Sequence, residues 1–337
     1  MKIIVDAMGG DNAPEAIVKG AVDARDKLGV DITLVGRKED IERCLGDTDR
    51  KGIEIVDARE VVTMDDDPST ATRRKKDSSM TVALNMVKNG HGDAVVSAGS
   101  TGALLTGATL IVKRIRGVRR AAMAPLLPSS ENGFLLIDCG ANAECTPEYL
   151  LQFAYMGGFY AKCIMGLDNP RVGLLNIGVE DSKGGELQHG AFKLLSEAAA
   201  RGQINFVGNV EASSMLFGGA DVIVTDGFSG NIALKTAEGV AKWLFTEIKT
   251  VFKSSAKNML AAAMVKKDVK AISYKMDPNR VGGTALLGIS KPVIKAHGSS
   301  NDEAFFAAIA QAKAFVEADI IGDIVKNIDN MKISEEA

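Results

Sequence analysis

Short apolar runs rich in Val and Ile recur along the chain, and a turn of Gly, Ser, Asn or Asp follows each before a helical spacing begins. Apolar strands that alternate with helices are typical of a largely parallel sheet covered on both faces. The pattern therefore predicts an α/β fold of three layers, αβα, with a large mostly parallel sheet. The runs expected as strands are KIIVDA, DITLVG, GIEIVDA, DAVVSAG, GFLLIDCGAN, RVGLLNIG, INFVGNV and DVIVTDGF. The segments expected as helices are 13–28, 38–46, 77–90, 101–116, 146–165, 185–202 and 231–250.

The pattern changes after residue 250. A small apolar island, Met259–Val265, lies there between lysines, and the chain then resumes with a strand or loop and a last helix. No Pro-rich or Ser-rich linker divides the sequence. We predict one α/β domain over 1–337, with a helical, lysine-flanked, hairpin-like projection at about 245–275 and a frayed tail at 329–337.

Composition narrows the class of protein. The 337 residues are 46% hydrophobic and carry a formal net charge of −3, so a sizeable core is expected and no general attraction to nucleic acid. The chain opens on a strand pattern, and no apolar run has the roughly 20 residues that span a bilayer, so we expect a cytoplasmic protein. Four cysteines without a CxxC pair argue against a zinc site or a disulfide scaffold.

The first candidate site is the turn that opens SAGSTGALLTGATLIV, residues 97–112. Ser97, Gly99, Ser100 and Thr101 make it uncharged and rich in hydroxyls, at the start of an expected helix. Free N–H groups and the helix dipole favour an anion there. The alternative is a capped helix whose small residues allow close packing, and the residues alone leave both open.

A second turn of the same kind follows the strand in VTDGFSGNIALKTAEG, residues 224–239. Ser229, Gly230 and Asn231 offer donors, and Asp226 either orients them or simply caps the helix. Two such turns at the carboxyl edge of one sheet favour a shared anion site.

Two further turns carry charged or reactive groups. In LIDCGANAECTPEY, Asp138 and Asn142 flank a glycine at a strand end, whereas Cys139 follows an apolar run with no basic neighbour and is interpreted as a packing residue. In NIGVEDSKGGELQHG, Lys183 is placed to meet a phosphate or an oxyanion, or the loop is only a solvated turn.

Three more stretches are ambiguous. The run RRKKDSSM is either a solvated face or a dock for an acidic partner, and His297 in KAHGSS is either a site histidine or a cap. The first turn, VDAMGGDNAPEA, resembles a phosphate loop, but Asp6 and Asp11 would repel a phosphate held by it alone. We interpret it as a wall of the site whose carboxylates orient donors from neighbouring loops.

In combination the motifs resemble the phosphate acyltransferase family of bacterial phospholipid synthesis, from Met1 to about Ala318. The resemblance implies the fold of isocitrate dehydrogenase and phosphotransacetylase. It also implies a homodimer that moves a fatty acyl group from acyl carrier protein to inorganic phosphate, with no metal and no organic cofactor. The motifs that carry it are VDAMGGDNAPE, RRKKDSSM, SAGSTGA, LIDCGAN, PRVGLLNIGVEDSKG, NFVGNVE, VTDGFSGN and KAHGSS.

The chain departs from the family pattern at a few positions. Ser100 stands where Asn is usual and Ser229 where Thr is usual, and both keep a small polar group. Ser182 replaces one of two expected lysines, so only Lys183 inherits a cationic role. We expect Lys183, Asn231 and Asp226 to act in catalysis. The residues expected to bind phosphate or the acyl group are Asp6, Gly9, Gly10, Asp11, Ser97, Gly99, Ser100, Thr101, Asp138, Asn142, Asn209, Ser229, Gly230 and His297.

The resemblance also implies surface contacts. An acidic carrier protein fits a basic surface, and apolar residues between lysines suit a peripheral contact with membrane, with dimer packing as the alternative. A glycerol-3-phosphate acyltransferase would use the product downstream. The residues expected on the carrier and membrane surface are Arg73, Arg74, Lys75, Lys76, Lys257, Met259, Leu260, Met264, Lys266 and Lys267.

Two other functions compete with this reading. A metal-dependent hydroxy-acid dehydrogenase of the same fold needs metal carboxylates and an arginine clamp, and the sequence offers no place for either. A non-catalytic regulator of phospholipid synthesis would bind phosphate or carrier protein without turnover.

Overall fold

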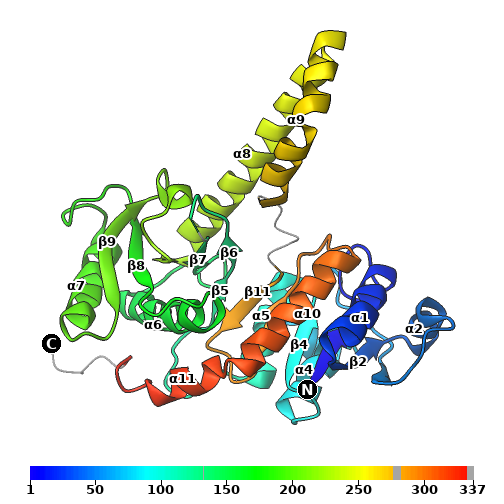
Figure 1. Ribbon diagram of the computed structural model, residues 1–337. Helices are drawn as coiled ribbons and strands as arrows, with labels where there is room; N and C mark the ends of the chain where they lie inside the picture. Colours follow the sequence, from blue (N-terminus) through cyan, green and yellow to red (C-terminus); the bar gives the residue numbers. More distant parts are fainter. Residues whose placement is uncertain (132, 276–281, 332–337) are drawn as a thin grey trace.

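The computed structural model describes residues 1–131, 133–275 and 282–331, and two sheets lie side by side in it (Figure 1). In the described chain the first sheet has seven strands in the order β3-β2-β1-β4-β12-β11-β5. Strands β1, β2, β3, β4 and β12 run parallel, and β11 is antiparallel to both of its neighbours. The strands are β1 (Lys2–Asp6), β2 (Asp31–Gly36), β3 (Ile53–Asp57), β4 (Ala94–Ser97), β5 (Ala122–Ala124), β11 (Thr284–Leu287) and β12 (Val293–Lys295).

The second sheet has five strands in the described residues, in the order β6-β7-β10-β8-β9. Only its edge strand β6 is antiparallel. Backbone bonds from Leu136 to Pro125 and from Cys139 to Met123 attach this sheet to the segment that leaves the first one. The strands are β6 (Leu126–Leu127), β7 (Phe134–Ile137), β8 (Arg171–Asn176), β9 (Asn205–Glu211) and β10 (Val222–Val224).

Alternation along β1 explains why helices cover both faces of the first sheet. Ile3 and Val5 point into a core shared with α1 and α10, whereas Ile4 points into a separate core with α4 and α5. All three side chains are fully buried. The helices around this sheet are α1 (Glu15–Leu28), α2 (Lys38–Leu45), α3 (Ala71–Arg74), α4 (Ser79–Lys88), α5 (Thr101–Gly107), which continues as a π-helical turn over Ala108–Val112, and α10 (Asp302–Glu317).

The second sheet is covered in the same manner. Helices α6 (Pro147–Ile164) and α7 (Glu186–Ala200) pack on one face, and α11 (Ile320–Lys326) contacts α6. The first turns of α8 (Gly227–Lys253) close a smaller core on the other face, around Phe134, Leu136 and Ile223.

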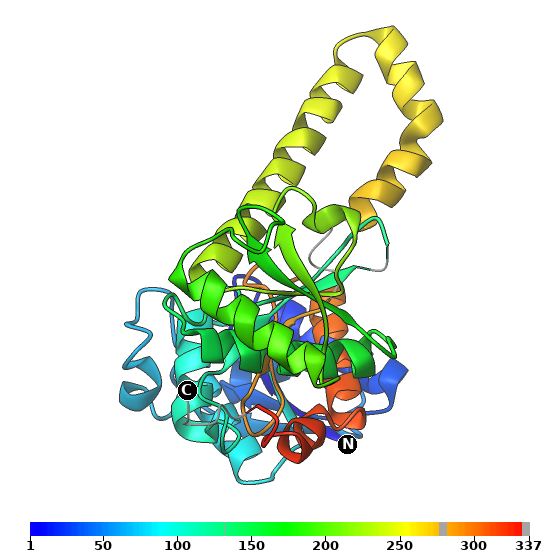
Figure 2. The same ribbon diagram turned by 90° about the vertical axis from the view of Figure 1, so that its left-hand side faces the viewer.

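Beyond its first turns α8 leaves the body of the protein, and α9 (Ala256–Lys275) returns beside it (Figures 1 and 2). This helix pair presents large apolar side chains to solvent, among them Trp243, Met259, Leu260 and Met264. Within the described residues, no helix has the length and apolar character that a membrane crossing requires.

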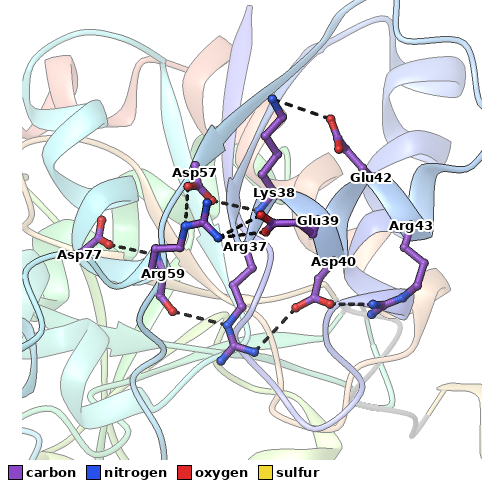
Figure 3. Close-up of polar contacts among 9 residues, drawn as sticks. All are labelled: Arg37, Lys38, Glu39, Asp40, Glu42, Arg43, Asp57, Arg59 and Asp77. Carbon is purple, nitrogen blue, oxygen red and sulfur yellow. Dashed lines mark hydrogen bonds and ion pairs between the residues drawn. The ribbon is translucent and has the colours of Figure 1, made fainter.

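Charged side chains at the carboxyl ends of the outer strands β2 and β3 pair with one another (Figure 3). Arg59 binds both oxygens of Glu39 and lies 2.7 Å from Asp57, and Asp40 holds Arg43 at 2.8 Å. Such exposed pairs stabilise a fold only modestly. The charges at the ends of β2 and β3 therefore have partners within the fold.

The predicted α/β class and the mostly parallel strands are confirmed, although the strands divide between two sheets. The short strands β5 and β6, in AAMAPLLP, were not predicted, and neither were the short helices α3 and α11. The end of the predicted tail, 332–337, lies outside the described residues.

Candidate functional site

Three adjacent strands of the first sheet end in polar residues at the same level. Asp6 of β1 pairs in register with Ser97 of β4, and Ser97 pairs with Lys295 of β12. Side chains in register on parallel strands point to the same face, so the three form a row. Exposure of all three is below 10%, with Asp6 at 1%, Ser97 at 0% and Lys295 at 7%.

Asp6 and Ser97 are already bonded to each other. The Ser97 hydroxyl donates to Asp6 Oδ2 at 2.6 Å, and the Gly99 amide donates to Ser97 Oγ at 3.1 Å. Burial raises the pKa of Asp6, while its hydrogen bonds and the nearby charge of Lys295 oppose the rise. The hydroxyl of Ser97 and the amide of Gly99 are thus committed to the wall of the site, although the sequence suggested them as ligand donors.

Lys295 was not among the expected site residues. Its ammonium group donates to the backbone oxygens of Ala98, at 3.4 Å, and of Ala296. Burial lowers the pKa of Lys295 to about 8, against the opposing charges of Asp6 and Asp11. The stretch KPVIKAHGSS contains the signal, because a lysine after a Val-Ile run marks a charged strand end.

The first loop braces the loop that follows β12. The Asp11 amide donates to the Gly298 oxygen at 2.8 Å, and the Asn12 side chain donates to Ser299 and Ser300 oxygens at 3.1 Å. A Cβ on Gly9 would lie 2.6 Å from Asp6 Oδ2, so this glycine is required for close packing with the neighbouring loop. Gly10 has φ +107°, and a Cβ on it would lie 2.9 Å from the Ala98 Cβ and 3.0 Å from the Gly298 oxygen.

His297 has one ring nitrogen fixed and one available. The Ser299 amide donates to Nδ1 at 3.2 Å, and the Ser299 hydroxyl lies 2.9 Å from the same atom. An accepting Nδ1 leaves the proton of a neutral ring on Nε2. His297 is exposed, so Nε2 can donate to a ligand.

Asp138 organises the opposite wall, at the end of β7. It is fully buried and accepts from the Met123 amide at 2.9 Å, from the Ala141 amide at 3.2 Å, and from both nitrogens of Asn142 at 2.7 and 2.9 Å. Burial raises the pKa of Asp138 despite these donors. A Cβ on Gly230 would overlap the Asp138 carbonyl oxygen, so α8 sits tight against this wall.

The start of α8 is capped from within. Asp226 is 7% exposed and accepts from the Ser229 amide at 2.8 Å, and the Gly230 amide donates to the Asp226 oxygen at 3.0 Å. These amides are therefore used by the helix itself. Asn231, the next residue, is exposed and faces the space beside Gly140.

A cavity of about 840 Å³ opens between these walls and runs along α8. Lys295, His297, Thr101 and Asn231 line its polar end. Its apolar lining comes from Met123, Pro125, Leu126, Leu127, Pro128, Leu216, Leu234, Ala237, Ala241 and Phe245, and the charged Lys235, Glu238 and Lys242 of α8 also line it. Cys139 also borders the cavity, but burial raises the pKa of its thiol, as suits a packing residue.

Two expected site residues lie elsewhere. Lys183 is exposed and does not line the cavity; its backbone oxygen accepts from the Asn176 side chain at 3.0 Å, and its amide donates to the Glu180 oxygen at 3.1 Å. Asn209 supports the same loop by donating to the Glu180 oxygen at 2.9 Å. The catalytic role of Lys183 stays a prediction. Ser100 is buried at the start of α5 beside Thr101.

In the basic run at 73–76, one of the four cations is bound within the fold and three are exposed to solvent. Lys75 is bound by Asp66 at 2.6 Å and by the Val61 oxygen at 2.8 Å, and this ion pair lowers the pKa of Asp66 to about 2. Arg73, Arg74 and Lys76 are exposed. Lys75 is therefore a fold-stabilising residue and does not belong with the exposed cations.

Comparison with known proteins places the chain among enzymes. A family model described as fatty acid synthesis protein matches residues 1–322. A phosphate acyltransferase of Oceanobacillus iheyensis is 48% identical over 338 residues, with 100% of both chains covered. A phosphate acyltransferase of Lysinibacillus sphaericus is 47% identical over 335 residues, covering 99% of this chain and 100% of that one.

Solved structures show the same fold at low identity. A phosphotransacetylase from Streptococcus pyogenes has a TM-score of 0.64 at 19% identity, with 94% of each chain covered. The EutD phosphotransacetylase from Staphylococcus aureus has a TM-score of 0.62 at 18% identity, covering 93% of this chain and 94% of that one.

Proposed function

The chain belongs to the phosphate acyltransferase family, and from this premise we propose that it moves a fatty acyl group from the thioester of acyl carrier protein to inorganic phosphate. The products are acyl phosphate and the free carrier thiol. The family makes the chain a transferase. The thioester donor and the steps below are our proposal for this sequence.

The observation that carries the proposal is the two-part cavity. Lys295, Thr101, Asn231 and His297 give it a cation, a hydroxyl, an amide and an imidazole, whereas the lining along α8 is mostly apolar, with Lys235, Glu238 and Lys242 interspersed. From Asn231 to Phe245 helix α8 rises about 21 Å, at about 1.5 Å per residue. An extended acyl chain advances about 1.25 Å per carbon, since its C–C bonds are about 1.5 Å long, so about 17 carbons fit beside α8.

The reaction we propose is a direct attack. One phosphate oxygen forms a bond to the thioester carbon, the carbonyl oxygen becomes a tetrahedral oxyanion, and the C–S bond then breaks with its electron pair on sulfur. The thiolate takes a proton from water. The donors that orient phosphate and stabilise the oxyanion are Thr101, Asn231 and the Nε2 of His297, which line the cavity together with Lys295. One such donor stabilises the transition state by about 3 kcal/mol.

Cys139 is not a nucleophile in this scheme. Its raised pKa keeps the thiol protonated, and thiolates are the reactive form. An acyl-enzyme on this residue is therefore not part of the proposal, and phosphate acts on the donor itself.

The carrier protein is expected to approach over basic surface. Arg73, Arg74 and Lys76 are exposed near α5, and Lys242 is exposed at the cavity rim. Complementary charge raises the rate of association of two proteins more than it raises their affinity. The exposed apolar side chains Ile177, Val179, Phe228 and Ile232 follow the carboxyl ends of β8 and β10 and support a homodimer contact.

We assign the tip of the helix pair to a peripheral contact with membrane, for a protein that otherwise works in the cytoplasm. Met259, Leu260 and Met264 are all more than half exposed, and Lys257 and Lys266 beside them suit anionic headgroups. A glycerol-3-phosphate acyltransferase that consumes acyl phosphate fits this location.

The test supplies acyl carrier protein thioester with and without inorganic phosphate. Free thiol and hydroxylamine-trappable acyl phosphate are followed together. We expect both to appear in equal amounts and only with phosphate. Thiol release that is indifferent to phosphate would identify a thioesterase, and binding without turnover would identify a regulator.

A further inference from the structure

Lys295 is a buried cation without a carboxylate partner. Within the described part of the chain no carboxylate oxygen lies within 4.0 Å of its ammonium nitrogen, and its two hydrogen-bond acceptors are the neutral oxygens of Ala98 and Ala296. The ammonium group has three donors, so one is left over. The side chain lines the polar end of the cavity.

This arrangement is unfavourable for folding alone. A buried charge with no carboxylate in contact is costly, and an apolar residue of similar size would avoid that cost. Neighbouring Asp6 does not relieve it by direct contact, because its oxygens accept from Ser97 and from the Met8 amide. The unsatisfied charge points to an anion that enters the cavity from solution.

We propose that Lys295 binds the inorganic phosphate and holds it, as nucleophile, at the end of β12. This rests on the proposed function, and it places the phosphate-neutralising charge on Lys295 and not on exposed Lys183. Thr101, Asn231 and His297 line the same end of the cavity and complete the set of donors around the anion.

Charge at this position depends on pH. Burial lowers the pKa of Lys295 to about 8, so the ammonium form is lost as the pH rises through that value and phosphate affinity falls with it. The charges that act on it are those of Asp6 on β1 and Asp11 in the loop after β1, and His297, in the loop after β12, lines the same cavity. Lys235, Glu238 and Lys242 border the cavity farther along α8.

The experiment measures binding of inorganic phosphate by titration calorimetry to the full chain between pH 6.5 and 9.5. Lys295→Met removes the charge, and Lys295→Arg keeps a charge that does not titrate in this range. Lys291→Met is the matched control, since Lys291 is exposed and lies two residues before the start of β12. Melting followed by circular dichroism checks that each variant is folded.

We expect Lys295→Met to weaken phosphate binding about 10-fold to 100-fold, the usual weight of a hydrogen bond to a charged group. Lys295→Arg should bind within about 10-fold of wild type and lose the decline near pH 8, and Lys291→Met should match wild type. Wild-type affinity in Lys295→Met, or the same decline near pH 8 in Lys295→Arg, would overturn the proposal.

Different results would overturn the role of Lys295 and the proposed transferase function. Phosphate-dependent acyl transfer that survives in Lys295→Met at wild-type phosphate KM overturns only the role of Lys295. Phosphate binding that depends on Lys295, in a wild type that transfers no acyl group, overturns only the transferase function. A wild type that binds no phosphate overturns the role of Lys295.

Discussion

The apolar side of the cavity predicts that residue 241 limits acyl chain length. Ala241 faces the cavity from α8 and lies between Asn231, at the polar end, and Phe245. Replacing it with Phe puts a ring across the path of the acyl chain. Val240 is the matched control, since it is 55% exposed and does not line the cavity.

The magnitude follows from the helix. From Asn231 to Ala241, α8 rises about 15 Å at about 1.5 Å per residue. That distance accommodates about 12 carbons at about 1.25 Å each. A 16-carbon chain then loses burial of about four methylenes, at most about 3 kcal/mol at about 0.8 kcal/mol each. Because the wall residues are only half-buried, we expect a loss between about 10-fold and 100-fold in kcat/KM for that donor.

The assay compares carrier proteins loaded with 8-carbon, 12-carbon and 16-carbon chains at saturating phosphate. In Ala241→Phe the 8-carbon donor should react at nearly the wild-type kcat/KM, while the 16-carbon donor falls. Val240→Phe should leave the ratio unchanged. An equal fall for all three donors, or no fall at all, would refute the path along α8, since only a blocked chain discriminates by length.

Other perturbations test separate parts of the structure. Gly9→Ala should lower the free energy of unfolding by about 1–3 kcal/mol, because the added Cβ would clash with Asp6 and Gly99. Gly158→Ala in α6 has open space around it and should raise the free energy of unfolding by about 0.5–1 kcal/mol. Urea titration measures both values, and an unchanged stability in Gly9→Ala would contradict the packing argument. Lys295→Met should raise the free energy of unfolding at pH 7 by up to about 3 kcal/mol, because the pKa of Lys295 is about 8 in the folded state and 10.5 ordinarily. In the wild type the cost of burying the charged lysine is complete below pH 8 and fades towards pH 10.5. A less stable Lys295→Met at pH 7 would disprove this assignment. The sequence-based prediction for Lys183→Ala is a loss of turnover much larger than any loss of carrier binding; turnover near wild type, which the position of Lys183 outside the cavity favours, would remove this lysine from the mechanism. The triple variant Met259→Ser, Leu260→Ser, Met264→Ser should no longer float with anionic vesicles, and unchanged flotation would assign this apolar island to another contact.

Sequence reasoning predicted the strands well where apolar runs are continuous. KIIVDA and DAVVSAG become β1 and β4 because their side chains are buried on both faces. It missed β5 and β6, since two or three residues beside Pro125 show no periodicity and only pairing with β11 and β7 defines them.

The sequence predicted which loops form the site, but it did not predict which side chains contact one another there. The strand ends near Asp6, Ser97 and Asn231 were expected to carry function, because polar turns follow buried strands. Lys295 was missed because a lysine after a Val-Ile run is a weak signal by itself, and its register with Ser97 and its lack of a carboxylate partner among the described residues are visible only in the fold. Lys75 is the converse case, since its ion pair with Asp66 is visible only in the fold.

The central claim is that phosphate attacks the thioester directly in this cavity, and a rapid-quench measurement tests it most directly. Enzyme in stoichiometric amount is mixed with labelled acyl carrier protein, first without phosphate and then with it, and thiol, protein-bound acyl group and acyl phosphate are counted. The account predicts no thiol and no protein-bound acyl group before phosphate is added, and one acyl phosphate for each thiol afterwards. A burst of thiol without phosphate, with the acyl group retained on the enzyme, would contradict it.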